Sequence, residues 1–133
     1  MVLFAAGNSG DDGEKTITSP SGAKNCLTVG ATLNSQQVFK AYETSVPDGV
    51  SGVFGPAYLA YFSSRGPASG KRIKPDVVAP GWWTVSANAK AGHSSVQAGY
   101  AEHCTVDALQ GTSMATPTAA GNVAIIRNSF TSK

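Results

Sequence analysis

The sequence predicts an α/β domain built around a mostly parallel β-sheet. The stretch "VLFAA" at residues 2–6 is apolar throughout and ends at Gly7, as in a strand buried on both faces, and "CLTVGAT" at 26–32 predicts a second strand. The last segment has a different period. Ala119, Val123, Ile126 and Phe130 follow one another at the spacing of a single helix face. Short buried strands followed by such a helix are typical of the α/β class.

The composition indicates a folded globular chain. Of its 133 residues, 41% are hydrophobic and 14% are charged, and 15 are glycine, which argues against disorder. This length suits one domain or a piece of a larger one.

The net charge is only +2, and the short basic cluster at 71–74 is interpreted as a solvated turn, so no nucleic-acid partner is expected. No apolar run is long enough for a membrane helix, and no signal peptide is visible.

The remaining elements are expected to be short. Gly, Ser, Asp and Pro make residues 7–22 a loop, and residues 65–70 a turn. Further strands are predicted at 58–64, 75–81, 84–87 and 105–111, and residues 88–104 are expected to form a surface loop. No element is assigned to residues 34–57.

The stretch "GTSMATP" at 111–117 predicts the start of the final helix. Pro117 is tolerated only near a first turn, so the helix is expected to begin just before it, capped by Ser113 or Thr112. A Ser113 hydroxyl at this place would lie at the positive end of the helix dipole, where free N–H groups stabilise a developing anion. Ser113 is therefore either a nucleophile or merely an N-cap, the common role of serine at a helix start.

The stretch "AAGNSG" at 5–10 carries the second candidate. Asn8 follows a buried strand, and the loops at the carboxyl ends of parallel strands build active sites. Its amide can donate a hydrogen bond to an oxyanion without carrying charge. The alternative is a turn asparagine that bonds its own backbone.

Taken together, four stretches in this order resemble the subtilisin-like serine peptidases (subtilases): "VLFAAGNSG", "FSSRGP", "KPDVVAPG" and "GTSMATP". Two others, "AKNCLTVGAT" and "GNVAIIRNSF", look most like the subgroup of oxidatively stable alkaline proteases and their eukaryotic relatives. The resemblance spans nearly the whole chain. It implies a three-layer fold, only partly present, in which residues 1–133 form the C-terminal part of the peptidase domain.

The resemblance also implies site residues. Ser113 matches the nucleophile, and Asn8 matches the oxyanion-hole asparagine that works with the backbone N–H of the serine. One wall of the pocket for the residue before the scissile bond is matched by Ala5, Ala6 and Gly7, and its floor by Ser19, Pro20, Ser21 and Gly22. A cis peptide is expected between Ser19 and Pro20. No cofactor is required for the chemistry; a structural calcium ion is allowed elsewhere in the complete protein, and no metal ligands are identified here.

The chain departs from the family pattern in its catalytic base. A subtilase triad runs Asp, His, Ser along the chain, and the first two motifs lie upstream of the block matched by "AAGNSG". His93 and His103 lack the family's histidine context. The aspartates also lack the triad context; they are Asp11, Asp12, Asp48, Asp76 and Asp107. The aspartate of "KPDVVAPG", Asp76, matches a position that is structural in the family.

The resulting prediction is a serine endopeptidase acting on proteins or peptides, in which this chain supplies the nucleophile and the oxyanion hole. A serine without an adjacent base is a weak nucleophile, so the chain alone is expected to be inactive. The alternatives are a catalytically dead peptide-binding remnant and an enzyme half complemented by another chain. The complete protein is expected to be secreted.

The two cysteines leave two possibilities open. Cys26 and Cys104 are far apart in the sequence, and no CxxC motif suggests a zinc or thioredoxin-type site. They form either one disulfide, which an oxidising compartment would favour, or two buried thiols. The family resemblance tilts the prediction toward the disulfide.

Overall fold

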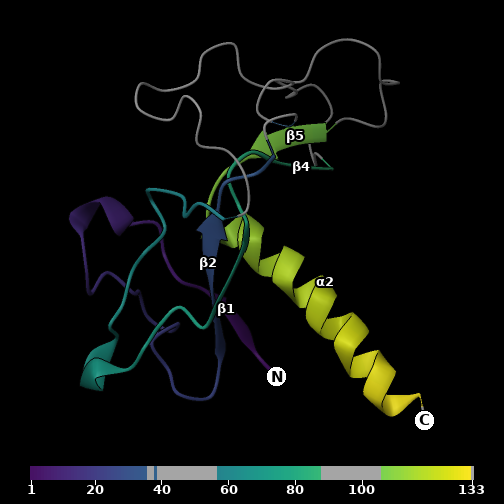
Figure 1. Cartoon of the computed structure of the whole chain (residues 1–133), viewed down its shortest axis with the longest axis horizontal. Helices are drawn as coiled ribbons and strands as arrows, with labels where there is room; N and C mark the ends of the chain where they lie inside the picture. Colours follow the sequence, from purple (N-terminus) through teal and green to yellow (C-terminus); the bar gives the residue numbers. More distant parts are fainter. Residues whose placement is uncertain (36–37, 39–56, 88–105, 133) are drawn as a thin grey trace.

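A computed structural model describes residues 1–35, 38, 57–87 and 106–132, and shows an α/β arrangement (Figure 1). Three parallel strands form one sheet in the order β1-β2-β3: β1 is Leu3–Ala5, β2 is Leu27–Thr32 and β3 is Val77–Pro80. A separate antiparallel pair consists of β4 (Thr84–Ala87) and β5 (Val106–Leu109). The long helix α2 spans Thr112–Thr131, and two short 3₁₀ turns are η1 (Gly10–Asp12) and η2 (Ser69–Lys71).

The central strand β2 sets the register of the parallel sheet. Val29 pairs with Ala5 of β1 on one side and with Val77 of β3 on the other. Parallel strands end at the same edge of a sheet, so the loop after β1 and the segment after β3 meet there. The first turn of α2 lies at this edge as well, because the N–H of Gly111 donates to the carbonyl of Gly81, at 2.8 Å.

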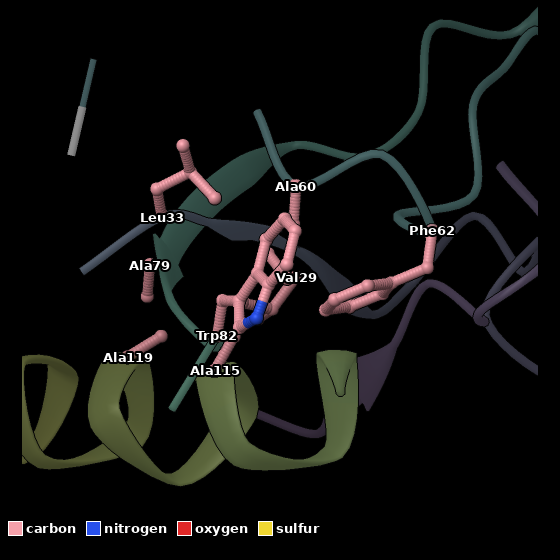
Figure 2. Close-up of a cluster of buried hydrophobic side chains, with 9 residues drawn as sticks. Val29, Leu33, Ala60, Phe62, Ala79, Trp82, Ala115 and Ala119 are labelled. Carbon is pink, nitrogen blue, oxygen red and sulfur yellow. The ribbon is translucent and has the colours of Figure 1, made fainter. Parts of the chain in front are cut away.

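One hydrophobic core joins the sheet to the first half of α2. Figure 2 shows β2 and β3 side chains facing the helix, with Trp82 and Phe62 closing the cluster. Its buried members are Val29, Ala31, Leu33, Ala60, Phe62, Ala79, Trp82, Ala115 and Ala119. Small residues on both sides allow the helix to approach the sheet closely: a Cβ added to Gly81 would lie 2.8 Å from that of Ala31 on β2 and 3.0 Å from that of Ala115 on α2. The first turns of α2 are therefore fixed against the sheet.

The α/β class and the parallel sheet are confirmed, whereas one predicted strand is wrong. Residues 58–64 pair with the sheet only at the single bridge between Leu59 and Thr32. The chain then turns, with the N–H of Ser63 donating to the carbonyl of Ala60 at 2.9 Å. The turn buries Ala60, Phe62 and Ser63 together, which an alternating strand with two opposite faces does not do.

The start of the helix also differs from the prediction. The N-cap is Gly111, and neither Thr112 nor Ser113 caps the helix with its side chain. The helix begins at Thr112, so Pro117 lies in the second turn rather than the first. Because proline has no N–H, the carbonyl of Ser113 lacks its usual helical donor.

The predicted apolar face of α2 is covered only at its beginning. Ala119 is buried and Val123 is half-buried, but Ile126 and Phe130 are 56% and 78% exposed. In Figure 1 the far half of α2 extends away from the sheet. Among the described residues α2 is the α-helix that covers the sheet, and the third layer stays a prediction. None of the described helices is both long and apolar enough to span a membrane.

Several predictions fall on residues outside the described ranges. These are the surface loop at 88–104 and the residues His93, His103, Asp48 and Cys104.

Candidate active site

The first residues of α2 contact the loop after β1, although the two are more than a hundred residues apart in sequence. The backbone N–H and the hydroxyl of Thr112 both donate to Oδ1 of Asn8, each at 2.9 Å. The same hydroxyl accepts a hydrogen bond from the N–H of Gly7, at 3.2 Å. Thr112 is only 1% exposed, so these bonds are shielded from water.

This contact fixes which way the Asn8 amide points. A backbone N–H can only donate, so the Asn8 atom facing Thr112 is the oxygen. The Nδ2 amino group therefore lies on the other side of the amide and keeps its donors available, on a residue that is exposed as a whole. Asn8 is thus a neutral hydrogen-bond donor in a fixed orientation.

Ser113 follows directly as the second helical residue, and it is exposed. The first bonds of the helix run from the N–H groups of Met114 and Ala115 to the carbonyl of Gly111, at 3.0 and 3.3 Å. The N–H of Ser113 precedes those bonds, and within the described ranges it has no acceptor. Ser113 therefore presents a hydroxyl and a free N–H together at the positive end of the helix dipole.

Two glycines make this close contact possible. Gly111 has φ of 150°, and a Cβ there would lie 3.2 Å from Nδ2 of Asn8. Gly7 has φ of 110°, and a Cβ there would lie 2.8 Å from side-chain atoms of Thr18 and Ser64. Both positions combine a backbone conformation that L-residues rarely adopt with insufficient room for a side chain.

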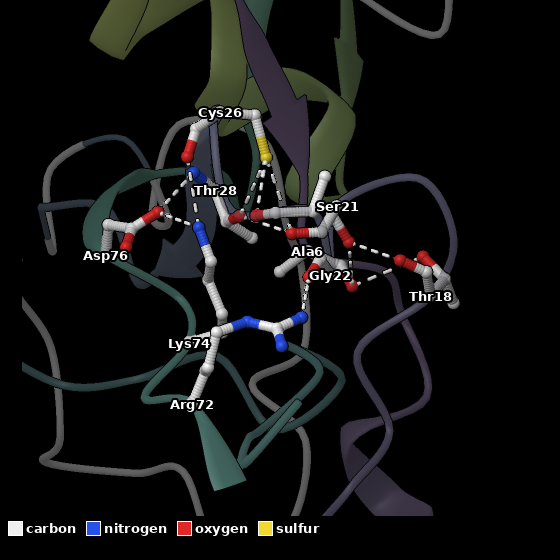
Figure 3. A network of polar contacts seen from close by, with 10 residues as sticks. Ala6, Thr18, Ser21, Gly22, Cys26, Thr28, Arg72, Lys74 and Asp76 are labelled. Carbon is white, nitrogen blue, oxygen red and sulfur yellow. Dashed lines mark hydrogen bonds and ion pairs between the residues drawn. The ribbon is translucent and has the colours of Figure 1, made fainter. Parts of the chain in front are cut away.

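The predicted pocket wall and floor lie side by side (Figure 3). The carbonyl of Ala6 accepts hydrogen bonds from the N–H of Thr18 at 3.1 Å and from the hydroxyls of Thr18 and Ser21 at 3.3 and 3.4 Å. Ala6 and Ser21 are fully buried, while Ser19 and Pro20 are exposed. The peptide between Ser19 and Pro20 is cis, as predicted; those before Pro67 and Pro75 are also cis.

A pocket of about 440 Å³ is lined in part by residues of the predicted floor. It is lined by Ile17, Thr18, Ser19, Pro20, Gly22, Ala23, Ala68 and Ser69. None of the three predicted wall residues contributes to it. The hydrogen bonds to Ala6, rather than this pocket, therefore connect the wall with the floor.

A polar network connects Lys74 and Asp76 to the predicted floor, as Figure 3 shows. The ammonium group of Lys74 donates to Oδ2 of Asp76 at 2.6 Å and to the carbonyl of Cys26 at 3.0 Å. The same carboxylate oxygen accepts the N–H of Thr28 at 2.7 Å, and the Thr28 hydroxyl donates to the carbonyl of Ser21 at 2.6 Å. The network thus runs from Lys74 to the fully buried floor residue Ser21.

The interpretation of residues 71–74 as a solvated basic turn is therefore wrong for two of the three cations. The Lys74 side chain is 5% exposed, and the guanidinium of Arg72 donates to the carbonyl of Gly22. Lys71 alone is exposed. A buried ammonium group needs a partner such as Asp76, and carbonyl oxygens supply the rest of its hydrogen bonds.

The surroundings of Asp76 lower the pKa of its carboxyl group. Desolvation raises the pKa of its carboxyl group, but hydrogen bonds from Lys74 and from the N–H of Thr28, with the Lys74 charge, outweigh it and lower the pKa. The carboxylate is therefore held in its charged form. This supports the structural role that the resemblance implies for Asp76.

No catalytic base accompanies Ser113 in the part of the chain that the structure describes. Asp11 and Asp12 lie on η1, and Asp107 lies on β5, where its side chain accepts the N–H of Ala108 at 2.8 Å. Both histidines are outside the described ranges. Within those ranges no three His, Cys, Asp or Glu residues form a metal-binding group.

The thiol of Cys26 lies among carbonyl oxygens of the floor loop. Its Sγ is 3.3 Å from the carbonyl oxygen of Ala23 and 3.6 Å from that of Ser21. Because Cys104 is outside the described residues, the disulfide between the two stays a prediction.

Several residues that hold the site were missed from sequence. Thr112 was considered only as a cap, and Ser64 was seen only as part of a motif. Lys74 and Arg72 were assigned to the surface. The partners of Thr112, Ser64 and Arg72 lie far away along the chain, so local pattern carries no signal for them. Lys74 is different: its partner Asp76 is two residues away, and their opposite charges in "KRIKPD" are the one hint at an ion pair.

The chain is similar to one family of known proteins and to several of its individual members. The family model described as "Subtilase family" matches residues 1–132. The chain is 37% identical to pyrolysin of Pyrococcus furiosus, over 95% of this chain and 9% of pyrolysin. It is 34% identical to the serine protease AprX of Bacillus subtilis, over 95% of this chain and 25% of AprX. The chain thus spans a quarter or less of these two relatives.

Among solved structures, the S41 psychrophilic protease superposes with a TM-score of 0.57 and 26% identity, over 93% of this chain and 32% of that one. The subgroup within the family stays a prediction. The chain belongs to the subtilase family of serine peptidases.

Proposed function

We propose that this chain is the nucleophile and oxyanion-hole part of a serine endopeptidase. The observation that carries the proposal is the double hydrogen bond from Thr112 to Oδ1 of Asn8. It turns the Asn8 amino group outward beside the start of α2, where Ser113 offers a hydroxyl and a free N–H. Two donors beside one nucleophile are what acyl transfer needs for its developing negative charge.

The reaction proceeds through an acyl-enzyme. Oγ of Ser113 attacks the carbonyl carbon of the scissile peptide bond, and a base takes the hydroxyl proton. The carbonyl oxygen becomes an oxyanion, which accepts hydrogen bonds from Nδ2 of Asn8 and from the N–H of Ser113. The C–N bond then breaks, the proton passes to the leaving amine, and water hydrolyses the remaining ester.

The base is the part of the machinery that this proposal takes from the resemblance. In the family it is a histidine oriented by an aspartate, both on motifs upstream of "AAGNSG". We therefore propose that residues 1–133 are the C-terminal part of a longer peptidase domain, and that the chain alone is inactive. The low coverage of pyrolysin and AprX supports this.

Substrate binding is assigned to the two segments that meet at the carbonyl of Ala6. Ala5, Ala6 and Gly7 form one wall for the side chain before the scissile bond, and the loop from Ser19 to Gly22 forms its floor. The hydrogen bonds of Ser21 and Thr18 to Ala6 support this pairing.

The substrates are proteins or peptides, no cofactor takes part in the chemistry, and a structural calcium ion is allowed elsewhere. Secretion of the complete protein stays a prediction.

A second candidate is a peptide-binding remnant that has lost its chemistry. It is favoured by one observation: the described residues contain no base for Ser113. An enzyme half completed by a separate chain fits the same observation. The three possibilities differ in what activates Ser113. In the longer peptidase a base of the same chain does so, in the complemented enzyme a base of a second chain does so, and in the remnant no base does.

Labelling with a fluorophosphonate probe tests the proposal, because such probes phosphonylate serine, with loss of fluoride, only where a base activates it. The complete protein that contains this chain is expected to incorporate the probe at Ser113 and to cleave casein, and Ser113→Ala to abolish both. The isolated chain is the control and is expected to remain unlabelled. A complete protein that neither reacts nor cleaves would support the remnant; reaction only after a second chain is added would support complementation.

A further inference from the structure

A buried serine from the "FSSRGP" segment lies directly behind the loop that carries Asn8. Ser64 is fully buried, and its N–H donates to the carbonyl of Gly7 at 2.9 Å. Its hydroxyl accepts the N–H of Ser9 at 3.1 Å. One residue therefore bonds to the backbone on both sides of Asn8.

The fit around this serine is tight. A Cβ added to Gly7 would lie 2.8 Å from Oγ of Ser64, so the hydroxyl occupies the space beside the glycine. One step further, the N–H of Gly10 donates to the carbonyl of Phe62 at 2.8 Å. Residues 62–64 thus lie alongside residues 7–10 and are joined to them by backbone hydrogen bonds, although neither segment forms a β-strand there.

Thr112 and Ser64 act on different parts of Asn8. Thr112 holds the side-chain oxygen, while Ser64 holds the two peptide groups that position the Cα atom. An oxyanion donor acts only within a few tenths of an ångström of its productive position, so both constraints matter. We propose that Ser64 is a positioning residue for Asn8, which sets the oxyanion donor through the backbone without contacting substrate. This inference rests on the proposed peptidase function.

The neighbouring Ser63 supplies a matched control. It is also fully buried, and its hydroxyl accepts one backbone hydrogen bond, from the N–H of Ala31 of β2 at 3.0 Å. A Cβ on Gly30 would lie 3.0 Å from this hydroxyl, so the Ser63 side chain faces the sheet rather than the Asn8 loop. Replacing either serine by alanine removes one buried hydroxyl and strands one backbone N–H, with a similar cost in stability.

The test compares Ser64→Ala with Ser63→Ala in the complete protein. Ser64→Ala is expected to lower kcat about tenfold with KM nearly unchanged, because a misplaced donor weakens only transition-state stabilisation. Ser63→Ala is expected to leave kcat within about twofold while lowering Tm to a similar extent. In an Asn8→Ala background, adding Ser64→Ala should change kcat little, since no side-chain donor is left to position.

Different outcomes separate this inference from the proposed function. If Ser113→Ala retains full turnover, the peptidase assignment fails. If Ser113→Ala is inactive but the two serine variants have equal kcat, or Ser64→Ala acts fully in the Asn8→Ala background, only the positioning role fails. A second readout does not need activity: the side-chain amide NMR signals of Asn8 should shift or broaden in Ser64→Ala and not in Ser63→Ala. Unchanged signals in both would overturn the inference.

Discussion

The two halves of helix α2 have opposite environments. Its first turns are enclosed by this chain: Thr112 and Ala115 are at most 1% exposed, and Thr112 bonds to a loop 104 residues away. Its far half is open, with Ile125 and Phe130 70% and 78% exposed. Contacts within the described residues therefore suffice to hold Thr112, Asn8 and the start of α2 together, whereas they leave the far half of the helix exposed.

The parallel sheet shows the same contrast. β2 is buried from Thr28 to Thr32, but Val77 and Val78 of β3 are 41% and 48% exposed. A parallel strand is normally covered on both faces, so exposed valines there are unusual for a domain that packs by itself. We therefore expect substitutions in the buried regions to have larger effects than substitutions in the exposed regions.

At the enclosed end, the largest effect is expected from Asn8→Ala in the complete protein. Loss of the amide donor should lower kcat by roughly 10²–10³ with KM nearly unchanged, a range known for the oxyanion asparagine of subtilisin rather than obtained from this structure. Steady-state kinetics on a peptide anilide would measure it. A raised KM with unchanged kcat would instead make Asn8 a binding or turn residue.

A smaller effect is expected from Thr112→Val. The valine keeps the shape and the backbone N–H bond to Asn8 but removes the hydroxyl that joins Asn8 to Gly7. We expect kcat to fall about tenfold, since one hydrogen bond to the oxyanion donor remains. Thr112→Ser, which retains the hydroxyl, should recover most of kcat. Equal kcat in the valine and serine variants would show that the hydroxyl does not orient Asn8.

These residues show what the sequence could predict and what it could not. Local pattern made Ser113 and Asn8 candidates, because Ser113 lies at the start of a helix and Asn8 follows a buried strand. Their roles as nucleophile and oxyanion donor come from the family resemblance and stay a proposal. The cap was predicted wrongly because the hydroxyl of Thr112, suited to capping its own helix, instead contacts Asn8 and Gly7 across the fold. Lys74 was assigned to the surface because a short basic cluster is usually solvated. Asp76 is near in sequence, but only the folded chain buries the ammonium group of Lys74 and brings the carbonyl of Cys26 to it.

In the network that connects to the pocket floor, Asp76→Ala should reduce stability rather than catalysis. The change leaves the Lys74 ammonium buried without its carboxylate, which we expect to cost about 1–3 kcal/mol at pH 7. Because folding lowers the pKa of Asp76, its contribution is present above the unfolded value near 3.9 and is lost as pH falls through the folded value. Urea unfolding of both proteins at pH 7 and pH 3 measures this.

The stability difference between wild type and Asp76→Ala should therefore shrink at pH 3. The exposed Lys71→Ala serves as the control, with no change at either pH. A difference that stays constant down to acid pH would contradict the assignment of the ion pair.

At the open end of α2 the smallest effect is expected. Ile126→Lys in the isolated chain should change the free energy of unfolding by no more than about 0.5 kcal/mol, because the side chain is 56% exposed. The same change should reduce self-association, as it places a charge on an exposed apolar face. Ala119→Lys, at a buried position of the same helix, should instead unfold the chain. Sedimentation velocity with thermal melts distinguishes the two.

A monomeric wild-type chain with a sharp melt, and a large loss of stability in Ile126→Lys, would show that the far half of α2 is packed after all.

A crystal structure of the complete protein phosphonylated at Ser113 would show whether Asn8 and the N–H of Ser113 hold one oxyanion together. The phosphonyl oxygen stands in for the oxyanion of the tetrahedral intermediate. We predict that this oxygen lies about 2.7–3.1 Å from both Nδ2 of Asn8 and the backbone nitrogen of Ser113, with Oδ1 of Asn8 still bonded to Thr112. A phosphonyl oxygen directed away from Asn8, or an Asn8 amide released from Thr112, would contradict the account.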